Sequence, residues 1–340
     1  MGWFSGHYNL RNKLIVISGG SQGLGASIAR LCVERGANVY IVARTEWKLQ
    51  KVVKSLKESI LDPDQIVGYV AADLSKQAEC ARVYETIGQV PDIVMCVAGL
   101  SLPGLLLEVP SESFETSIDC IYKSSLYFSV EALRVISKAP KSAEPRHITL
   151  FSSVVAFLGF IGYGSYSPLK QAVRGLADVL RQEAIPFNVK VECVFPGNID
   201  TEGFENEEKT KPEITKQIEG PSDVMNPDKC AELILSRLDS GQQMVHTDAI
   251  GWILNGLMLG SSPRTHGVFL TLTGFILSLV VPIWNLIVNN QIKTYFKKRE
   301  ELAASINNNE VEDDEQVEND EELEDDQGLE DESSSSQLLN

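Results

Sequence analysis

Short apolar runs rich in β-branched residues alternate with longer amphipathic stretches from Lys13 to about Met244. This alternation is typical of a parallel sheet whose strands are joined by crossover helices. It predicts strands at Leu14–Ser18, Val39–Ala43, Ile66–Ala72, Ile93–Val97, Ile148–Ser152 and Val189–Phe195, and a weaker one at Gln243–Thr247. It predicts helices at Leu24–Arg35, Trp47–Ser59, Ser111–Ser137, Tyr166–Ile185 and Pro227–Leu238. We therefore expect one doubly wound α/β domain with a parallel sheet, at residues 1–248.

The hydrophobic pattern changes after Asp248. A brief apolar run covers residues 249–260, and the 25 residues from Gly267 to Gln291 include no charged side chain. That length suits a membrane segment, although a buried C-terminal helix is the alternative. We expect a membrane-associated hydrophobic region at residues 249–292, followed by a basic collar and an acidic tail at residues 293–340.

The charge is concentrated at the C-terminal end. The chain has 30 Lys and Arg against 47 Asp and Glu, a formal net charge of −17, and 15 of the acidic residues lie between positions 310 and 332. Only −2 remains for the rest of the chain, which leaves no basic surface for nucleic acid. The acidic, Ser-rich segment from about Asn307 is predicted to be disordered.

The six cysteines fall singly, without a CxxC pair or a histidine at metal-ligand spacing. We expect reduced core thiols and no metal site. The N-terminal residues 1–11 are polar and do not resemble a secretory signal, so the catalytic part is expected in the cytosol.

The predicted membrane region brings two rules into conflict. One crossing from a cytosolic domain would place the basic collar, Lys293, Lys297, Lys298 and Arg299, on the lumenal side, against the positive-inside tendency. A re-entrant bend at Pro282, or pairing with the shorter apolar run, would return the chain to the cytosolic side. We predict that both termini face the cytosol.

A glycine-rich turn joins the first predicted strand to the first helix. Its sequence is Ser18-Gly19-Gly20-Ser21-Gln22-Gly23-Leu24-Gly25. Glycines at this junction allow a pyrophosphate to approach the backbone, and the helix start favours its charge. Tight turns and close helix packing also use glycine, but the strand before and the helix after favour a dinucleotide site of the Rossmann type, which comprises Gly19, Ser21, Gln22, Gly23, Leu24 and Gly25.

The end of the second strand indicates which dinucleotide is bound. An acidic residue there would bind a ribose 2′-hydroxyl, whereas the sequence Ala43-Arg44-Thr45 offers a cation suited to a 2′-phosphate. Arg44 is otherwise a solvated strand-end charge. NADPH is therefore favoured over NADH, with Asp73, Leu74 and Gly99 expected to contact it from the ends of the third and fourth strands.

A candidate catalytic set follows the fifth strand. Tyr166 and Lys170 lie four residues apart, hence on one helix face, where the ammonium can lower the pKa of the phenol. Ser153, thirteen residues before Tyr166, would hydrogen-bond the substrate oxygen. A Tyr–Lys pair at this spacing is often a surface pair, but here it accompanies the glycine turn and the serine.

These motifs, together with Pro196-Gly197 and Thr201, resemble the short-chain dehydrogenase/reductase family over roughly residues 10–245. The resemblance implies that Tyr166 is the acid, that Lys170 also binds the nicotinamide ribose, and that Pro196 and Thr201 contact the coenzyme. The stretch from Asp200 to Pro212, Val42-Ala43-Arg44 and the hydrophobic C-terminal segment are similar to the 3-ketodihydrosphingosine reductases of that family.

The chain departs from the family pattern at two places. Cys96-Val97-Ala98-Gly99 stands where Asn-Asn-Ala-Gly is usual, and no Asn occurs between Ser111 and Ser137, where Cys120 or Ile121 takes the place of a further catalytic Asn. The usual water relay to Lys170 is therefore in question.

The resemblance implies NADPH-dependent reduction of 3-ketosphinganine to sphinganine at the cytosolic face of the endoplasmic reticulum membrane. The expected partners are a long-chain keto lipid and the membrane, and a homo-oligomer is possible. The apolar segments Leu100–Leu107 and Phe157–Ile161 contact an acyl chain or are ordinary loop packing. Two alternatives are a membrane-bound reductase of a steroid, retinoid or fatty acyl ketone, and a scaffold that binds NADPH without turnover.

Overall fold

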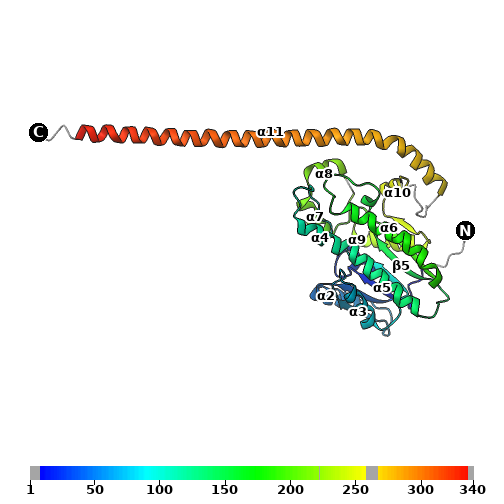
Figure 1. Ribbon diagram of the computed structural model, residues 1–340. Helices are drawn as coiled ribbons and strands as arrows, with labels where there is room; N and C mark the ends of the chain where they lie inside the picture. The colour runs from blue at the N-terminus through cyan, green and yellow to red at the C-terminus, as the bar shows by residue number, and fades with distance from the viewer. Residues whose placement is uncertain (1–7, 222, 258–266, 336–340) are drawn as a thin grey trace. The chain divides into compact units, whose positions relative to one another are not determined.

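A seven-stranded parallel sheet forms the centre of the computed structural model (Figure 1). The structure describes residues 8–221, 223–257 and 267–335, with side chains as far as Ser305. The strands are β1 Leu14–Ser18, β2 Asn38–Ala43, β3 Val67–Ala71, β4 Ile93–Cys96, β5 Arg146–Phe151, β6 Val189–Phe195 and β7 Met244–His246. Their order in the sheet is β3-β2-β1-β4-β5-β6-β7, which confirms the predicted doubly wound fold.

Helices connect these strands. Those of the main framework are α1 Gly23–Glu34, α2 Glu46–Lys57, α3 Gln77–Ile87, α4 Ser111–Ser117, α5 Ser124–Lys138, α6 Ser167–Glu183 and α9 Pro227–Asp239. Shorter elements are the π-helical turn η1 Ile118–Lys123, the 3₁₀ turns η2 Val154–Ala156 and η3 Ile185–Phe187, and the helices α7 Glu202–Thr210, α8 Glu213–Glu219 and α10 Ala249–Asn255. The predicted strands are confirmed, as are the predicted helices apart from Ser111–Ser137, with small shifts at their ends.

The two faces of the sheet bury separate cores. Val16 of β1 packs in one core with residues of α3, α5 and α6, whereas its neighbours Ile15 and Ile17 pack in the other with residues of α1, α2 and α9. Side chains that alternate between two covered faces explain why the strands are almost wholly apolar. The sheet order reverses between β1 and β4, and ligands of such folds bind beyond the carboxyl ends of the strands at this point.

Two local features differ from the expectation. The predicted helix Ser111–Ser137 is interrupted by the π-helical turn η1, which divides α4 from α5. Helix α3 was not among the predicted helices, although its buried residues Cys80, Val83, Tyr84 and Ile87 follow helical spacing.

Helix α10, which precedes the apolar C-terminal helix in the chain, packs against the sheet domain. The chain divides into two units, Met1–Val281 and Pro282–Asn340. In the first unit, Asp248 caps α10, and Asn255 at the end of α10 hydrogen-bonds the ring of His246 in β7 at 3.2 Å. The described part of the run 249–260 is thus attached to the sheet domain, although its composition placed it with the membrane region.

Helix α11 (Gly267–Ser335) contains the apolar segment. Within the described residues, Gly267–Ser305 is the one helix long and apolar enough to cross a membrane, with a mean hydropathy of 2.0 over an 18-residue window. Pro282 lies inside this helix, and the bend or pairing that would return the chain stays a prediction. Helix α11 is drawn as far as Ser335, and the disorder expected of the acidic tail stays a prediction.

Candidate active site

The glycine turn has the backbone that an anion site requires. Gly19 and Gly23 have φ angles of +69° and +54°, in the left-handed region that favours glycine. A Cβ on Gly25 would lie 2.3 Å from the carbonyl oxygen of Gly19, so this position has no room for a side chain. Helix α1 starts at Gly23, and no side chain caps it at Gln22, which leaves first-turn N–H groups for a phosphate. The turn therefore fits the pyrophosphate of a dinucleotide.

The same turn lies against the end of β4. A Cβ on Gly19 would be 2.8 Å from the backbone of Ala98, and the Ser18 hydroxyl accepts a hydrogen bond from the Ala98 N–H at 3.2 Å. A Cβ on Gly99 would be 3.4 Å from the Nζ of Lys170. The segment after β4 thus bridges the phosphate turn and the candidate catalytic lysine.

Ser153, Tyr166 and Lys170 come together beyond the end of β5. Tyr166 hydrogen-bonds Ser153 through their side chains, and the Lys170 Nζ lies 5.7 Å from the centroid of the Tyr166 ring. The Lys170 N–H donates to the Tyr166 carbonyl at 3.1 Å, so the two residues are one helical turn apart at the start of α6. All three side chains are mostly buried in this structure.

The pKa of the Tyr166 phenol is raised in this structure, whereas we expected it to be lowered. Burial first, and then the charge of Glu207, raise the pKa of the Tyr166 phenol, and the hydrogen bond to Ser153 offsets only part of the increase. The Lys170 Nζ, whose charge we expected to lower that pKa, donates to the Phe151 carbonyl at 2.9 Å. Burial lowers the pKa of Lys170 from 10.5 to about 8, with a small opposing effect of Cys193.

The predicted 2′-phosphate ligand Arg44 lies directly after β2 and is exposed. Its guanidinium lies within hydrogen-bonding reach of the Cys120 thiol and offsets part of the pKa increase that burial causes there. Arg44 therefore belongs to the edge of the site formed by β2 and η1.

Asp73 and Leu74 follow β3, at the same end of the sheet. The Asp73 carboxylate accepts a hydrogen bond from the Ser75 hydroxyl at 2.8 Å and lies 3.5 Å from the Lys76 ammonium. Burial would raise the pKa of Asp73, but these contacts lower it overall. Leu74 is buried in the core, so in this structure its side chain has a packing role.

Pro196 and Thr201 approach the site from the segment after β6. The Pro196 carbonyl accepts a hydrogen bond from the Ser153 hydroxyl at 3.4 Å. The Thr201 side chain caps α7 by accepting from the Phe204 N–H at 3.1 Å, and a Cβ on Gly23 would be 3.1 Å from its methyl group. Thr201 thus lies between α7 and the phosphate turn.

A buried polar cluster beside Tyr166 was missed in the sequence. The Tyr163 hydroxyl donates to the Glu207 carboxylate at 2.6 Å, and the Tyr163 and Tyr166 ring centroids are 5.9 Å apart. The ammonium of Lys211, whose side chain is 1% exposed, pairs with Glu207 at 3.3 Å, Glu219 at 2.9 Å and Glu208. Three carboxylates thus share one ammonium close to the candidate acid. The sequence alone gives little sign that the Lys211 side chain is buried, because a run of charged residues is usually exposed to solvent.

The π-helical turn η1 occupies the place of the missing family Asn. Ile121 is fully buried, Cys120 is partly exposed, and neither offers an amide. The hydroxyls of Ser124 and Ser125 donate to the carbonyls of Cys120 and Ile121 at 2.7 and 2.8 Å. Backbone groups that the π-helical turn disturbs are thus satisfied by serine side chains.

The apolar segments Leu100–Leu107 and Phe157–Ile161 contain both buried and exposed side chains. Phe157 is buried, with its ring centroid 4.5 Å from that of Phe195, and Leu105 is 7% exposed. Leu107 is fully exposed and Leu106 is 61% exposed. Ordinary core packing therefore accounts for Phe157 and Leu105, whereas Leu106 and Leu107 present apolar surface.

Comparison with known proteins agrees with this geometry. The model of the short chain dehydrogenase family matches residues 13–212. A 3-ketodihydrosphingosine reductase of Yarrowia lipolytica is 41% identical over 301 residues, which cover 87% of this chain and 81% of that protein. Reductases of the same name from Debaryomyces hansenii and Aspergillus fumigatus are 38% and 33% identical, over 84% and 82% of this chain and 90% and 83% of their own lengths.

Solved structures share the fold. A short chain dehydrogenase from Burkholderia cenocepacia in complex with NADP has a TM-score of 0.58 and 22% identity, and covers 74% of this chain and 94% of its own. A short-chain dehydrogenase from Sphingobium yanoikuyae in complex with NADPH has a TM-score of 0.59 and 22% identity, over 70% and 88% of the two chains.

Proposed function

The chain belongs to the short-chain dehydrogenase family, and on this premise we propose that it reduces 3-ketosphinganine to sphinganine with NADPH. The observation that carries the proposal is the convergence of Ser153, Tyr166 and Lys170 with the phosphate turn at one end of the sheet. The substrate is supported by relatives named 3-ketodihydrosphingosine reductases at 33–41% identity. The coenzyme is supported by the fit of the glycine turn and by the cation Arg44.

Reduction of the ketone needs a hydride at carbon and a proton at oxygen. NADPH, when bound, supplies the hydride to C3 of the substrate and leaves as NADP⁺. Tyr166 donates the proton to the developing alkoxide, and the C=O bond becomes a secondary alcohol. Its raised pKa keeps the phenol protonated at neutral pH, so that the proton is available when the alkoxide forms.

Ser153 and Lys170 assist the proton donation by Tyr166. The Ser153 hydroxyl donates a long bond of 3.4 Å to the Pro196 carbonyl and also contacts the Tyr166 phenol, so it can hydrogen-bond a substrate oxygen that lies beside that phenol. Lys170 is fixed by the Phe151 carbonyl, and its positive charge stabilises the tyrosinate that forms after proton transfer.

Glu207 favours an amino ketone over other lipid ketones. 3-Ketosphinganine bears an ammonium on the carbon next to its ketone, whereas steroid, retinoid and fatty acyl ketones do not. The Glu207 carboxylate acts on Tyr166 electrostatically and shares the single Lys211 ammonium with Glu208 and Glu219. An ammonium held beside the reacting carbonyl would supply the further positive charge that this cluster accommodates.

We also propose that the enzyme lies at the endoplasmic reticulum membrane, with the catalytic domain facing the cytosol. The apolar helix Gly267–Ser305 supports attachment to a membrane. All six cysteines are free thiols, five of them buried, which suits a reducing compartment.

The test uses full-length protein in mild detergent. NADPH consumption is measured with 3-ketosphinganine, with the same chain bearing a ketone but no amine, and with a steroid and a retinoid ketone. We expect turnover of 3-ketosphinganine well above that of the others, and in Glu207→Gln a larger loss for the amino ketone than for the ketones without an amine, with Glu213→Gln on the exposed surface of α8 as the matched control. Higher turnover of a ketone without an amine would overturn the substrate assignment, and NADPH binding without turnover of any ketone would indicate the scaffold.

A further inference from the structure

Helix α10 exposes its apolar residues and buries a polar one. Its inner face contains Gly251 and Asn255, and the Asn255 amide hydrogen-bonds the ring of His246. On its outer face Ile250 is 65% exposed and Ile253 is 38% exposed. A surface helix of a soluble domain normally buries its isoleucines and exposes its asparagine. The outer face of α10 therefore has the composition of a surface that an apolar partner covers.

This apolar helix is in close contact with the start of α11. A Cβ on Gly256, directly after α10, would lie 3.2 Å from the backbone nitrogen of Gly274 and 3.3 Å from the carbonyl oxygen of Leu270. Near this contact α11 exposes large apolar side chains, namely Val268, Phe269 and Leu272. The sequence from Ala249 to Pro263 contains no charged residue. The apolar surface of α10 thus continues into that of the candidate membrane helix.

We propose that the outer face of α10 rests on the lipid bilayer and that the long-chain ketone reaches the active site from the bilayer along this helix. The inference rests on the membrane attachment and the lipid substrate proposed above. A bilayer is the partner that fits, because α10 contacts the helix that is long and apolar enough to cross one. Trp252, half-buried beside the two isoleucines, suits the boundary between lipid and water, where tryptophan is enriched.

The inner side of α10 lies against loops of the active site. A Cβ on Gly251 would be 2.8 Å from the side chain of Val154, which directly follows Ser153. The Gly197 N–H donates to the Thr247 hydroxyl at 3.0 Å, just before α10 begins. One side of α10 therefore contacts the loop of the catalytic serine, while the other side is open to lipid. A ketone that moves along this helix keeps its acyl chain in apolar surroundings.

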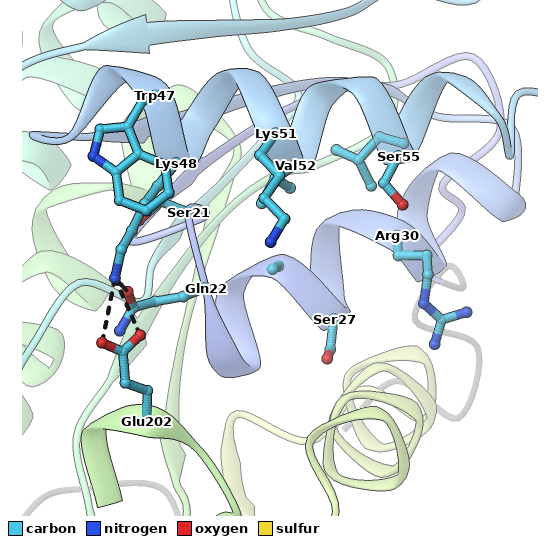
Figure 2. Close-up of a pocket in the computed structure, with 12 residues that line it drawn as sticks. Ser21, Gln22, Ser27, Arg30, Trp47, Lys48, Lys51, Val52, Ser55 and Glu202 are labelled. Atoms are coloured by element: carbon cyan, nitrogen blue, oxygen red, sulfur yellow. Dashed lines mark hydrogen bonds and ion pairs between the residues drawn. The ribbon is translucent and has the colours of Figure 1, made fainter. Parts of the chain in front are cut away.

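The coenzyme side of the domain has a different surface. A pocket of about 740 Å³ between α1 and α2 is lined by the charged residues Arg30, Lys48, Lys51 and Glu202 (Figure 2). Lys48 and Glu202 form an ion pair there at 3.1 Å. Charged groups are costly to bury in hydrocarbon, so this side faces water, from which the soluble coenzyme arrives. The two reactants thus approach the site from surfaces of different chemistry.

Photochemical cross-linking tests the contact with lipid. The full-length chain is reconstituted in phosphatidylcholine vesicles with the photoreactive residue benzoylphenylalanine at one position at a time. Positions 250 and 253 report on α10, exposed Phe275 on α11 is the positive control, and exposed Ile185 in η3 is the negative control. We expect about 10-fold more phospholipid adduct at positions 250 and 253 than at position 185, because acyl chains surround the apolar face of an interfacial helix.

The controls separate the possible failures. Lipid adducts at position 275 without adducts at positions 250 and 253 would overturn the inference alone. Adducts of positions 250 and 253 mainly with a second copy of the chain would also overturn it, because the face would then be a protein interface. If position 275 gives no lipid adduct either, the proposed membrane attachment fails and the inference fails with it.

Turnover tests the route of the substrate. In vesicles, Ile253→Glu should raise KM for 3-ketosphinganine about 10-fold and leave KM for a water-soluble, short-chain analogue with the same amine unchanged, because only the long chain arrives from lipid. Ile185→Glu should leave both KM values close to wild type. An equal increase for both ketones, or no increase for either, would overturn the route along α10. If wild type reduces neither ketone, the proposed function itself fails.

Discussion

Replacing Lys170 with methionine tests the effect of the buried ammonium on stability and, independently, on turnover. The side chain of methionine has a similar length and no charge, and Lys170 is 5% exposed in the native protein. The pKa of Lys170 is lowered from 10.5 to about 8 by burial, so the folded protein holds its proton less firmly than the unfolded chain does. At pH 7 the ammonium is still about nine-tenths protonated, and at pH 9 only about one-tenth.

The first consequence concerns stability. Because the pKa of Lys170 is lower in the folded state, the unfolded chain binds more protons between pH 8 and pH 10.5, and wild-type stability rises through that window. At about 1.4 kcal/mol for each pKa unit, wild type should gain about 3 kcal/mol relative to Lys170→Met between these pH values. Lost packing and the lost bond to the Phe151 carbonyl add a constant offset, which cancels in this comparison. Urea unfolding in mild detergent at several pH values measures it.

The second consequence concerns turnover. Loss of Lys170 should lower kcat/KM by about 10²- to 10⁴-fold at pH 7. In wild type, kcat/KM should fall about tenfold per pH unit above pH 8 as the ammonium is lost, and this decline should be absent from the residual activity of Lys170→Met. Lys54→Met, on the exposed surface of α2, is the matched control. A wild-type profile flat to pH 9.5, together with an unchanged stability difference, would refute the assignment.

Three further predictions concern the coenzyme, acid stability and the membrane. Arg44→Ala should weaken NADPH at least 10-fold more than NADH in direct binding measurements, because only NADPH carries the 2′-phosphate; equal losses would exclude Arg44 as the selecting residue. Burial, and then the charge of Arg237, lower the pKa of His246 to about 4, so stability should fall as pH decreases from 6.5 to 4, by up to about 3 kcal/mol from this residue. Urea unfolding should show a shallower acid slope in His246→Gln, and an unchanged slope would contradict this reasoning. In sealed microsomes, a tag after Asn340 should be digested by added protease without detergent, and a fully protected tag would show a single crossing.

Local pattern was sufficient to predict the sheet. Strands such as β1 and β6 are buried on both faces, so their sequences are short, nearly continuous apolar runs, which are typical of the strands of a covered parallel sheet. The glycine turn and the Tyr166–Lys170 spacing could be predicted for a similar reason, because each depends on residues close together in the chain.

Contacts between distant segments could not be predicted. The pKa of Tyr166 depends on its burial and on Glu207, which lies 41 positions further along the chain. The Lys48–Glu202 pair joins α2 to α7, and only the folded chain brings them together. The π-helical turn η1 also follows from tertiary packing, since Ser111–Ser137 has a plain helical pattern.

The central claim is that Tyr166 protonates a 3-ketosphinganine carbonyl that receives hydride from NADPH. The most direct measurement incubates wild type and Tyr166→Phe with 3-ketosphinganine and NADPH that carries deuterium at both C4 positions of the nicotinamide, and analyses the product by mass spectrometry. Wild type should form sphinganine with deuterium on C3, and Tyr166→Phe should form it about 10²- to 10⁴-fold more slowly while binding NADPH normally. Unlabelled sphinganine, or near-normal turnover by Tyr166→Phe, would contradict the mechanism.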